Sequence, residues 1–300
     1  MKRTGVVVVG VVVAIGFAVI ATWAGKAPSR PKILGIAGVE IVATNRPATN
    51  LFYGRLVELS GPCNWCENNP YKLIELPSDQ IIGVSPAPRT APKNLLASVT
   101  FLVDNEKAMK QWLIVNHVAV KSSWGPYGDR SLYLSVIDPE GHQIYFRGAH
   151  GDKTDYKHLP VIHAGWVVKD RAAMDKFYKD VLGFHVYWSG GMKDGVADWV
   201  DMQVPDGTDW IEYMLNIPTD ADKRLLGVMN HIALGVPDVR AAAKALEAEG
   251  VTLPEQPKIG RDGKWQLNLY DPDLTRVELM EFAPVEKPCC SEYLGPHPKP

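Results

Sequence analysis

The chain has 300 residues, of which 46% are hydrophobic and 22% are charged, and its formal net charge is −2 at pH 7. This balance is typical of a globular protein, and the length allows about two domains. Lysine and arginine residues are dispersed, without the basic stripe and interleaved aromatic residues that are typical of nucleic-acid binding. We therefore expect no nucleic-acid partner.

The first 25 residues differ in composition from the rest of the chain. Lys2 and Arg3 precede an uncharged, mostly apolar run from Thr4 to Gly25. This run is longer than the apolar part of a usual signal peptide and just long enough to span a bilayer. Residues 1–25 are therefore expected to be a signal peptide or a membrane anchor. The protein is expected to be exported, periplasmic or extracellular, or anchored to a membrane through this segment alone.

The cysteines point to disulfides rather than to a redox or zinc site. Cys63 and Cys66 form a CNWC motif, and Cys289 and Cys290 are adjacent in a Pro-rich tail over residues 286–300. Zinc binding needs a second spaced pair, which adjacent cysteines do not supply. We expect structural disulfides, in keeping with export, with three pairings open. The tail itself is expected to be extended or mobile.

The chain repeats one structural plan four times: a short apolar strand, a polar break, an amphipathic helix and further strands. The repeats begin near Gly38, Ser98, His163 and His231. In the last two, apolar residues recur at helical spacing until Gly183 and Gly250 stop the helix. We therefore predict an α+β fold of four βαβββ modules. They are paired into two similar domains over residues 34–150 and 158–285.

Two histidines open strands in the second half of the chain. Alternation along a strand places His231, Ala233 and Gly235 on one face, and His163 and Gly165 on one face of the other strand. A single buried histidine is more often a satisfied core residue than a metal ligand. Two histidines at matching positions favour a metal site instead. The small residues Ala233 and Gly235 are expected to leave space beside His231.

Two glutamates interrupt later apolar strands in the same way. Glu212 lies in WIEYMLN and Glu278 lies in RVELMEF. Without a partner, a carboxylate amid the apolar residues around Glu278 would be a costly buried charge, so coordination is the better interpretation. For Glu212, a position facing water at a sheet edge is the alternative to coordination.

This arrangement resembles the vicinal oxygen chelate superfamily, which includes glyoxalase I, extradiol dioxygenases, and fosfomycin- and bleomycin-resistance proteins. The resemblance is strongest from His163 to Phe282. It implies two domains of this type and one divalent metal ion, which could be Fe, Mn, Ni, Co or Zn. The implied ligands are His163, Glu212, His231 and Glu278, with Glu212 and Glu278 also serving as catalytic carboxylates. The equivalent positions of the first half hold Gly38, Gly83, Ser98 and Tyr145, which implies a metal-free first domain.

Three functions are compatible with these residues, and each acts on or binds a small molecule. The first is a metal-dependent isomerase or lyase that moves a proton next to a carbonyl group of a small oxygen-bearing substrate. The expected export argues against glyoxalase I itself, whose glutathione adduct is intracellular. The second is an extradiol Fe(II) dioxygenase of catechol-type substrates, with His163, His231 and Glu278 as ligands. The third is a binding or resistance protein without catalysis or metal.

The dioxygenase motif is not reproduced in full. Tyr270 directly precedes the Asp271-Pro272 turn, whereas the family separates the two, and Leu274 stands where the family has a glycine. We therefore favour the isomerase or lyase slightly. Four modules in one chain can close a site without a partner, and either a monomer or a homodimer is compatible with the sequence.

Overall fold

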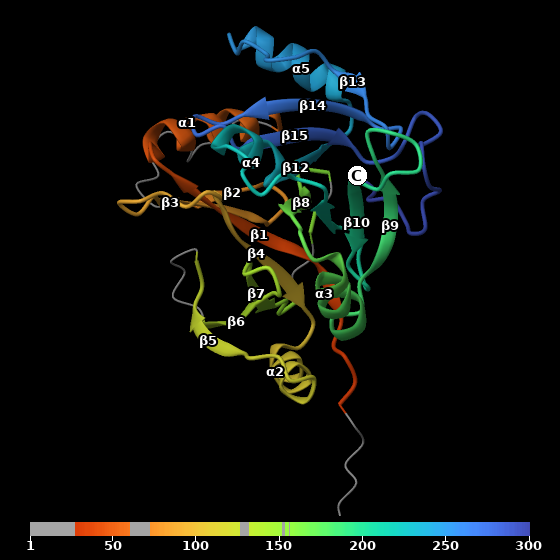
Figure 1. Cartoon of the computed structure of the whole chain (residues 1–300). Coiled ribbons are helices and arrows are strands. Elements are labelled where there is room, and N and C mark those ends of the chain that lie inside the picture. Colours follow the sequence, from red (N-terminus) through yellow and green to blue (C-terminus); the bar gives the residue numbers. More distant parts are fainter. Residues whose placement is uncertain (1–27, 61–72, 127–131, 152–153, 156) are drawn as a thin grey trace, which may run out of the picture.

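The computed structural model describes residues 28–60, 73–126, 132–151, 154–155 and 157–300 (Figure 1). The expected signal peptide or anchor over residues 1–25 lies outside this part of the chain, as do Cys63 and Cys66. Among the described residues, no helix is long and apolar enough to cross a membrane.

The first half of the chain forms a seven-stranded mixed sheet in the order β2-β3-β1-β4-β7-β6-β5. At its centre, β1 pairs antiparallel with β4, and each of these strands also has a parallel neighbour, β3 for β1 and β7 for β4. The strands are β1 (Ile33–Ala43), β2 (Leu73–Glu75), β3 (Ile81–Pro86), β4 (Leu96–Val103), β5 (Lys121–Trp124), β6 (Leu132–Ile137) and β7 (Gln143–Gly148).

The second half forms an eight-stranded sheet with the same central arrangement, in the order β13-β14-β15-β12-β8-β11-β10-β9. Here β8 and β12 are the antiparallel central pair, flanked by the parallel strands β11 and β15. The strands are β8 (Val161–Val167), β9 (His185–Gly190), β10 (Trp199–Gln203), β11 (Trp210–Met214), β12 (His231–Val236), β13 (Lys258–Ile259), β14 (Trp265–Tyr270) and β15 (Arg276–Glu281).

One helix follows the first strand of each module, and a polar side chain caps its first turn. Asn45, Asn105, Asp170 and Asp238 each accept a hydrogen bond from a backbone N–H of the helix they precede. These are the polar breaks of the predicted repeat. The helices are α1 (Arg46–Val57), η1 (Glu58–Ser60), α2 (Glu106–Val115), α3 (Arg171–Asp175), η2 (Lys176–Val181), α4 (Lys223–Met229) and α5 (Val239–Ala248).

The α+β fold predicted from the sequence is confirmed, with two differences in detail. In the described residues, the first module has two strands after its helix rather than three. The helix of the third module is not one α-helix, because α3 continues into a single π-helical segment, η2. Both predicted helix stops adopt a left-handed backbone, with φ of 80° at Gly183 and 77° at Gly250, a conformation that glycine adopts without strain.

A continuous hydrophobic core joins the two sheets. Phe101 of the first sheet contacts Phe184 of the second half with ring centroids 5.3 Å apart. Gln80 forms a polar link nearby: its Nε2 donates to the Val161 carbonyl at 2.9 Å, and its Oε1 accepts from the Val161 N–H at 2.7 Å. The first domain is therefore packed against β8, the strand that carries His163.

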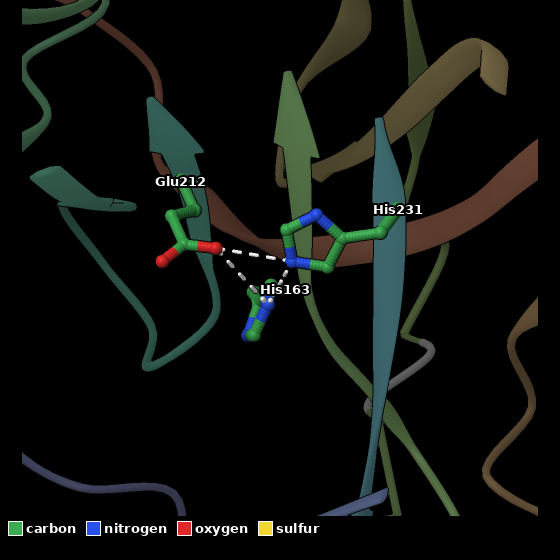
Figure 2. A group of neighbouring side chains, drawn as sticks. All are labelled: His163, Glu212 and His231. Atoms are coloured by element: carbon green, nitrogen blue, oxygen red, sulfur yellow. Dashed lines mark hydrogen bonds and ion pairs between the residues drawn. The ribbon is translucent and has the colours of Figure 1, made fainter. Parts of the chain in front are cut away.

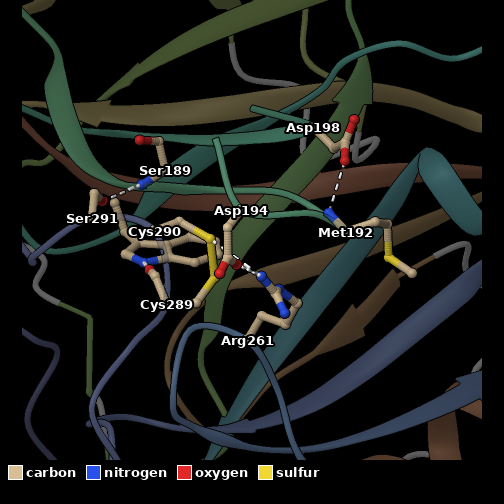
Figure 3. Close-up of a disulfide and its surroundings, with 9 residues drawn as sticks. Ser189, Met192, Asp194, Asp198, Arg261, Cys289, Cys290 and Ser291 are labelled. Atoms are coloured by element: carbon tan, nitrogen blue, oxygen red, sulfur yellow. Dashed lines mark hydrogen bonds and ion pairs between the residues drawn. A yellow bond between two sulfur atoms is a disulfide. The ribbon is translucent and has the colours of Figure 1, made fainter. Parts of the chain in front are cut away.

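The Pro-rich tail over residues 286–300 is irregular in conformation and docked on the second sheet. Tyr293 Oη donates to the Asp262 carbonyl at 2.8 Å, and Gln203 Nε2 donates to the Pro296 carbonyl at 2.9 Å. The tail contains a disulfide between the adjacent residues Cys289 and Cys290, shown in Figure 3 beside Arg261. This is one of the pairings that the sequence left open.

Candidate metal centre

The four predicted ligands lie on the four central strands of the second sheet, one on each of β8, β11, β12 and β15. Gly165 on β8 pairs with both Glu212 on β11 and His231 on β12. Ala233 on β12 likewise pairs with both His163 on β8 and Glu278 on β15. Because side chains two residues apart on a strand share a face, this register places all four side chains on one face of the sheet.

The side chains converge as Figure 2 shows, with Glu212 and His231 turned toward His163. His231 Nε2 lies 3.1 Å from His163 Nε2 and 3.0 Å from Glu212 Oε2. Ligand atoms of these three residues all lie within 4.8 Å of one another. The Oε2 of Glu278 lies 3.7 Å from His163 Nε2. The structure therefore brings His163, Glu212 and His231 into one group, and Glu278 lies beside His163 at its edge.

The hydrogen bonds of His231 indicate which ring nitrogen is available. His231 Nδ1 lies 3.1 Å from the Met229 carbonyl oxygen, which can only accept, so we assign the proton to Nδ1. Nε2 then carries a lone pair directed at the cluster. Such an outer hydrogen bond is the usual way in which proteins orient a metal-binding imidazole.

Space for the His231 ring comes from Gly165 rather than from the residues predicted for this role. A Cβ at Gly165 would lie 2.1 Å from His231 Cε1, so no larger residue fits beneath the ring. A Cβ at Gly235 would instead lie 2.4 Å from Cε1 of Phe282. The expectation that Gly235 leaves space beside His231 was therefore wrong, because Gly235 accommodates the Phe282 ring.

Burial determines the protonation of the cluster in the absence of a metal. Loss of solvation lowers the pKa of His163 and of His231 well below the usual value, with nearby Arg276 adding to the effect. Burial also raises the pKa of Glu212 to about 7 and that of Glu278 to about 8. Both imidazoles are therefore neutral and able to coordinate at neutral pH, whereas the two carboxyl groups are partly protonated there and a bound cation would favour their ionised forms.

The formal charges around the cluster also fit a divalent cation. Four carboxylates and two cationic side chains interact at the site, which leaves two formal negative charges. The groups are Asp201, Glu212, Asp262, Glu278, Lys264 and Arg276. Two neutral imidazoles and two carboxylates are donors that suit Fe, Mn, Co, Ni or Zn. The residues present therefore fit a divalent metal ion of unassigned identity.

Sequence reasoning missed two cationic residues at this site. Arg276 lies two residues before Glu278, so strand alternation could have identified it. Lys264 gave no such signal. It is fully buried, and its Nζ lies 4.5 Å from the centre of the Trp210 ring and 5.4 Å from that of Tyr293 in the docked tail. Trp210 in turn contacts His163, with ring centroids 4.8 Å apart.

Comparison with known proteins agrees with this geometry. Residues 161–279 match the family model described as Glyoxalase/Bleomycin resistance protein/Dioxygenase superfamily. The matched residues contain all four candidate ligands. The second half of the chain is therefore similar to this superfamily, also called the vicinal oxygen chelate superfamily. No curated protein matches the chain significantly.

Several solved structures share the fold of both domains. An extradiol ring-cleaving dioxygenase from B. fuscum superposes with a TM-score of 0.62 at 19% identity, covering 85% of this chain and 73% of its own. Homoprotocatechuate 2,3-dioxygenase from Arthrobacter globiformis gives 0.61 at 18% identity, covering 86% and 82%. The 2,3-dioxygenase LapB from Pseudomonas sp. KL28 gives 0.60 at 14% identity, covering 91% and 96%. The paired-domain architecture is thus that of extradiol dioxygenases.

Proposed function

We propose that this protein is a divalent-metal enzyme that transfers a proton on a small oxygen-bearing substrate, as an isomerase or a lyase. The observation that carries the proposal is the position of Glu212, whose Oε2 lies 3.0 Å from His231 Nε2 and 3.7 Å from His163 Nε2. Glu212 thus faces the cluster rather than water. With Glu278, whose Oε2 lies 3.7 Å from His163 Nε2, it would give the site four protein ligands.

Four protein ligands distinguish this site from a facial triad. A triad of two histidines and one carboxylate leaves three positions of a six-coordinate metal open, whereas four ligands leave two. Two positions suit a bidentate oxygen substrate but leave none for a second reactant such as dioxygen. When bound, the metal ion would polarise a substrate oxygen as a Lewis acid and acidify the adjacent C–H bond.

We assign the proton transfer to Glu212, with Glu278 as the second catalytic carboxylate. The side chain of Glu212 is 14% exposed and that of Glu278 is 5% exposed, so Glu212 is the more accessible of the two carboxylates. The pKa of Glu212, raised by burial to about 7, is close to the value that favours general-base catalysis at neutral pH. Asp201 pairs directly with Glu212 across β10 and β11, and repulsion between the carboxylates favours retention of a proton by the pair.

Extradiol ring cleavage is the second candidate. It is favoured by the similarity to extradiol dioxygenases over both domains. In this function His163, His231 and Glu278 would bind Fe(II), and Glu212 would not be a ligand. The two candidates therefore make opposite predictions for Glu212.

Metal analysis combined with oxygen uptake tests the proposal. We expect the purified protein to retain about one divalent metal ion per chain and to consume no oxygen with a panel of catechols. Glu212→Ala should lower metal affinity, and Glu212→Gln should retain more of it because the amide oxygen can still coordinate. Bound iron with catechol-dependent oxygen uptake would show that the enzyme is a dioxygenase. A protein that takes up no metal on reloading would be a binding module.

The location of the enzyme is part of the proposal. The apolar segment over residues 1–25 supports export or membrane anchoring. Cell fractionation, with N-terminal sequencing of the recovered protein, tests this assignment and distinguishes a cleaved signal peptide from a retained anchor.

A further inference from the structure

Arg276 extends into the metal centre from the start of β15. It precedes Glu278 by two residues, so strand alternation directs both side chains to the same face of the sheet. Its Nη2 lies 2.7 Å from His231 Nε2. Because Nδ1 of His231 carries the ring proton, Nε2 is the acceptor and the guanidinium is the donor.

This hydrogen bond uses the lone pair that a metal ion would need. A guanidinium has no lone pair to share and repels a cation, so Arg276 and a metal ion cannot both bind His231 Nε2. In the metal-bound protein the guanidinium must turn aside. Its backbone in β15 keeps it close to the metal position.

The guanidinium has unused donors in the described structure. Its Nε is buried and has no hydrogen-bond partner, and it forms no ion pair with any carboxylate of the described residues. A buried guanidinium donor without an acceptor is costly, and an oxyanion is the partner that matches its planar fork. Among the described residues, none accepts a hydrogen bond from Arg276 Nε. An oxyanion of the substrate could supply this acceptor.

The other cation at the site, Lys264, is already enclosed. Its Nζ lies 3.3 Å from the Tyr187 hydroxyl and is surrounded by the rings of Tyr187, Trp210 and Tyr293. Lys264 is completely buried, whereas Arg276 is only partly buried. Of these two cations, Arg276 alone has exposed surface.

We propose that Arg276 determines substrate specificity by binding a carboxylate group that lies next to the metal-binding oxygen atoms of the substrate. The substrate class is thus a small, carboxylate-bearing molecule with two neighbouring oxygen donors. This inference rests on the metal site of the proposed function, but it does not depend on which reaction follows.

Ligand binding to the Co(II)-loaded protein under nitrogen tests this assignment, because cobalt bands in the visible spectrum report both metal loading and inner-sphere ligands. The probes are catechol and 2,3-dihydroxybenzoate, which share two neighbouring hydroxyl groups and differ by one carboxylate beside them. We expect the wild-type protein to bind 2,3-dihydroxybenzoate more tightly by about 10- to 100-fold, as for a charge-assisted hydrogen-bonded pair.

Substitution of Arg276 tests whether its side chain causes the preference for the carboxylate. Arg276→Met keeps the apolar stem, so it should abolish the preference for the carboxylate while changing catechol affinity by less than about 3-fold and leaving cobalt loading intact. Arg276→Lys keeps the positive charge but lacks the planar guanidinium with its paired N–H donors, so it should retain part of the preference for the carboxylate. Arg240→Met, which removes an exposed arginine stacked on Trp265, is the matched control and should behave as wild type.

The outcomes separate the two proposals. A wild-type protein that loads no Co(II) overturns the metal site, and the assignment of Arg276 falls with it. A loaded protein that shows no preference overturns only the assignment of Arg276. The assignment of Arg276 is also overturned if Arg276→Met keeps the preference for the carboxylate, or if it weakens the binding of both probes equally.

Discussion

The two domains share one sheet arrangement but differ at every position of the metal centre. The register of the first sheet aligns Gly38, Gly83, Ser98 and Tyr145 with the four candidate ligands of the second. All four lie on the central strands, as the sequence predicted. The fold therefore provides a place where four strands can present ligands, and the first domain has the same arrangement with other residues at these positions.

One pair of residues shows how this position can be filled in two ways. In the second domain Gly165 pairs with His231, and the imidazole lies over the glycine. In the first domain Glu40 pairs with Ser98, and the Ser98 hydroxyl donates to Glu40 Oε2 at 3.4 Å. Ser85 donates to the other carboxylate oxygen. Where the second domain has a glycine beneath a large ring, the first has a large side chain beside a serine. The large and the small residue of the pair are thus interchanged between the two strands. The polar cluster of Glu40, Ser98 and Ser85 stands where the second domain has candidate ligands.

The largest expected effect comes from removing a ligand. His231→Ala deletes the nitrogen closest to both His163 and Glu212. Metal affinity should fall by more than about 100-fold, because even outer partners of metal ligands contribute about 10- to 100-fold. Ser98→Ala, at the equivalent position of the first domain, should leave metal content unchanged. Elemental analysis after dialysis measures both variants, and full occupancy in His231→Ala would refute the ligand assignment.

The next largest effect should follow from adding one carbon atom at Gly165. A Cβ there would lie 2.1 Å from His231 Cε1 and would displace the ring. For Gly165→Ala we expect a loss of about 1–3 kcal/mol in the free energy of unfolding, as is usual for overpacking. Metal affinity should fall about 10-fold or more, because a displaced ring misdirects its nitrogen. Metal titration and urea unfolding measure the two effects.

Glu40→Ala is the matched control for Gly165→Ala. It removes side-chain volume at the equivalent position of the first domain, and the metal affinity of the second domain should not change. Wild-type metal affinity in Gly165→Ala would show that the His231 ring has room to move, and that the contrast between the two domains does not depend on this glycine.

A smaller effect should appear in the pH dependence of stability of the metal-free protein. Burial raises the pKa of Glu278 to about 8, whereas the unfolded chain titrates near about 4.3. Between these values the folded state holds more protons than the unfolded state, so this group makes the free energy of unfolding fall as pH rises. Glu278→Gln should flatten this fall, by on the order of 1–3 kcal/mol between pH 5 and 8.

Urea unfolding in the presence of a chelator at several pH values measures this difference. The two histidines contribute with the opposite sign, because their pKa values are lowered, but that contribution is common to both proteins. The difference between wild type and Glu278→Gln therefore reports Glu278 together with its electrostatic effect on the neighbouring Glu212, Asp262 and Asp201. Parallel pH curves for the two proteins would contradict the raised pKa.

The smallest expected effect lies in the turns that precede the last strand of each domain. Gly141 has φ of 90° in the first domain, and Leu274 has φ of 69° at the matching position of the second. A left-handed backbone costs an L-residue about 1–2 kcal/mol, and Leu274 is 45% exposed, so its packing offsets only part of this cost. Leu274→Gly should raise the free energy of unfolding by about 1 kcal/mol, and Gly141→Leu should lower it by a similar amount. Lower stability in Leu274→Gly would show that Leu274 is held mainly by its contacts.

Much of the fold could be predicted from the sequence because the informative signals are local. Alternation along strands, helical spacing and the stops at Gly183 and Gly250 report which face of an element is apolar and where it ends. Repetition of the same plan four times then indicated paired modules. The positions of His163, His231 and Glu278 were apparent at this level, because each is a polar residue on an apolar strand.

The sequence did not predict what depends on contacts between distant residues. Gly165 lies beneath His231 only because β8 and β12 pair in one particular register, and Gly235 serves Phe282 instead. Lys264 is surrounded by rings from three separate segments, one of them in the docked tail. No local periodicity encodes such neighbours, since they are set by strand register and tail docking.

By itself, the sequence determined the kind of site: two imidazoles and two carboxylates on matching strands of a repeated module. Only the tertiary structure decided that Glu212 faces this cluster rather than water, and that Arg276 reaches His231 Nε2. The physical reason is that alternation assigns a side chain to a face, whereas strand pairing and sheet curvature determine what that face meets.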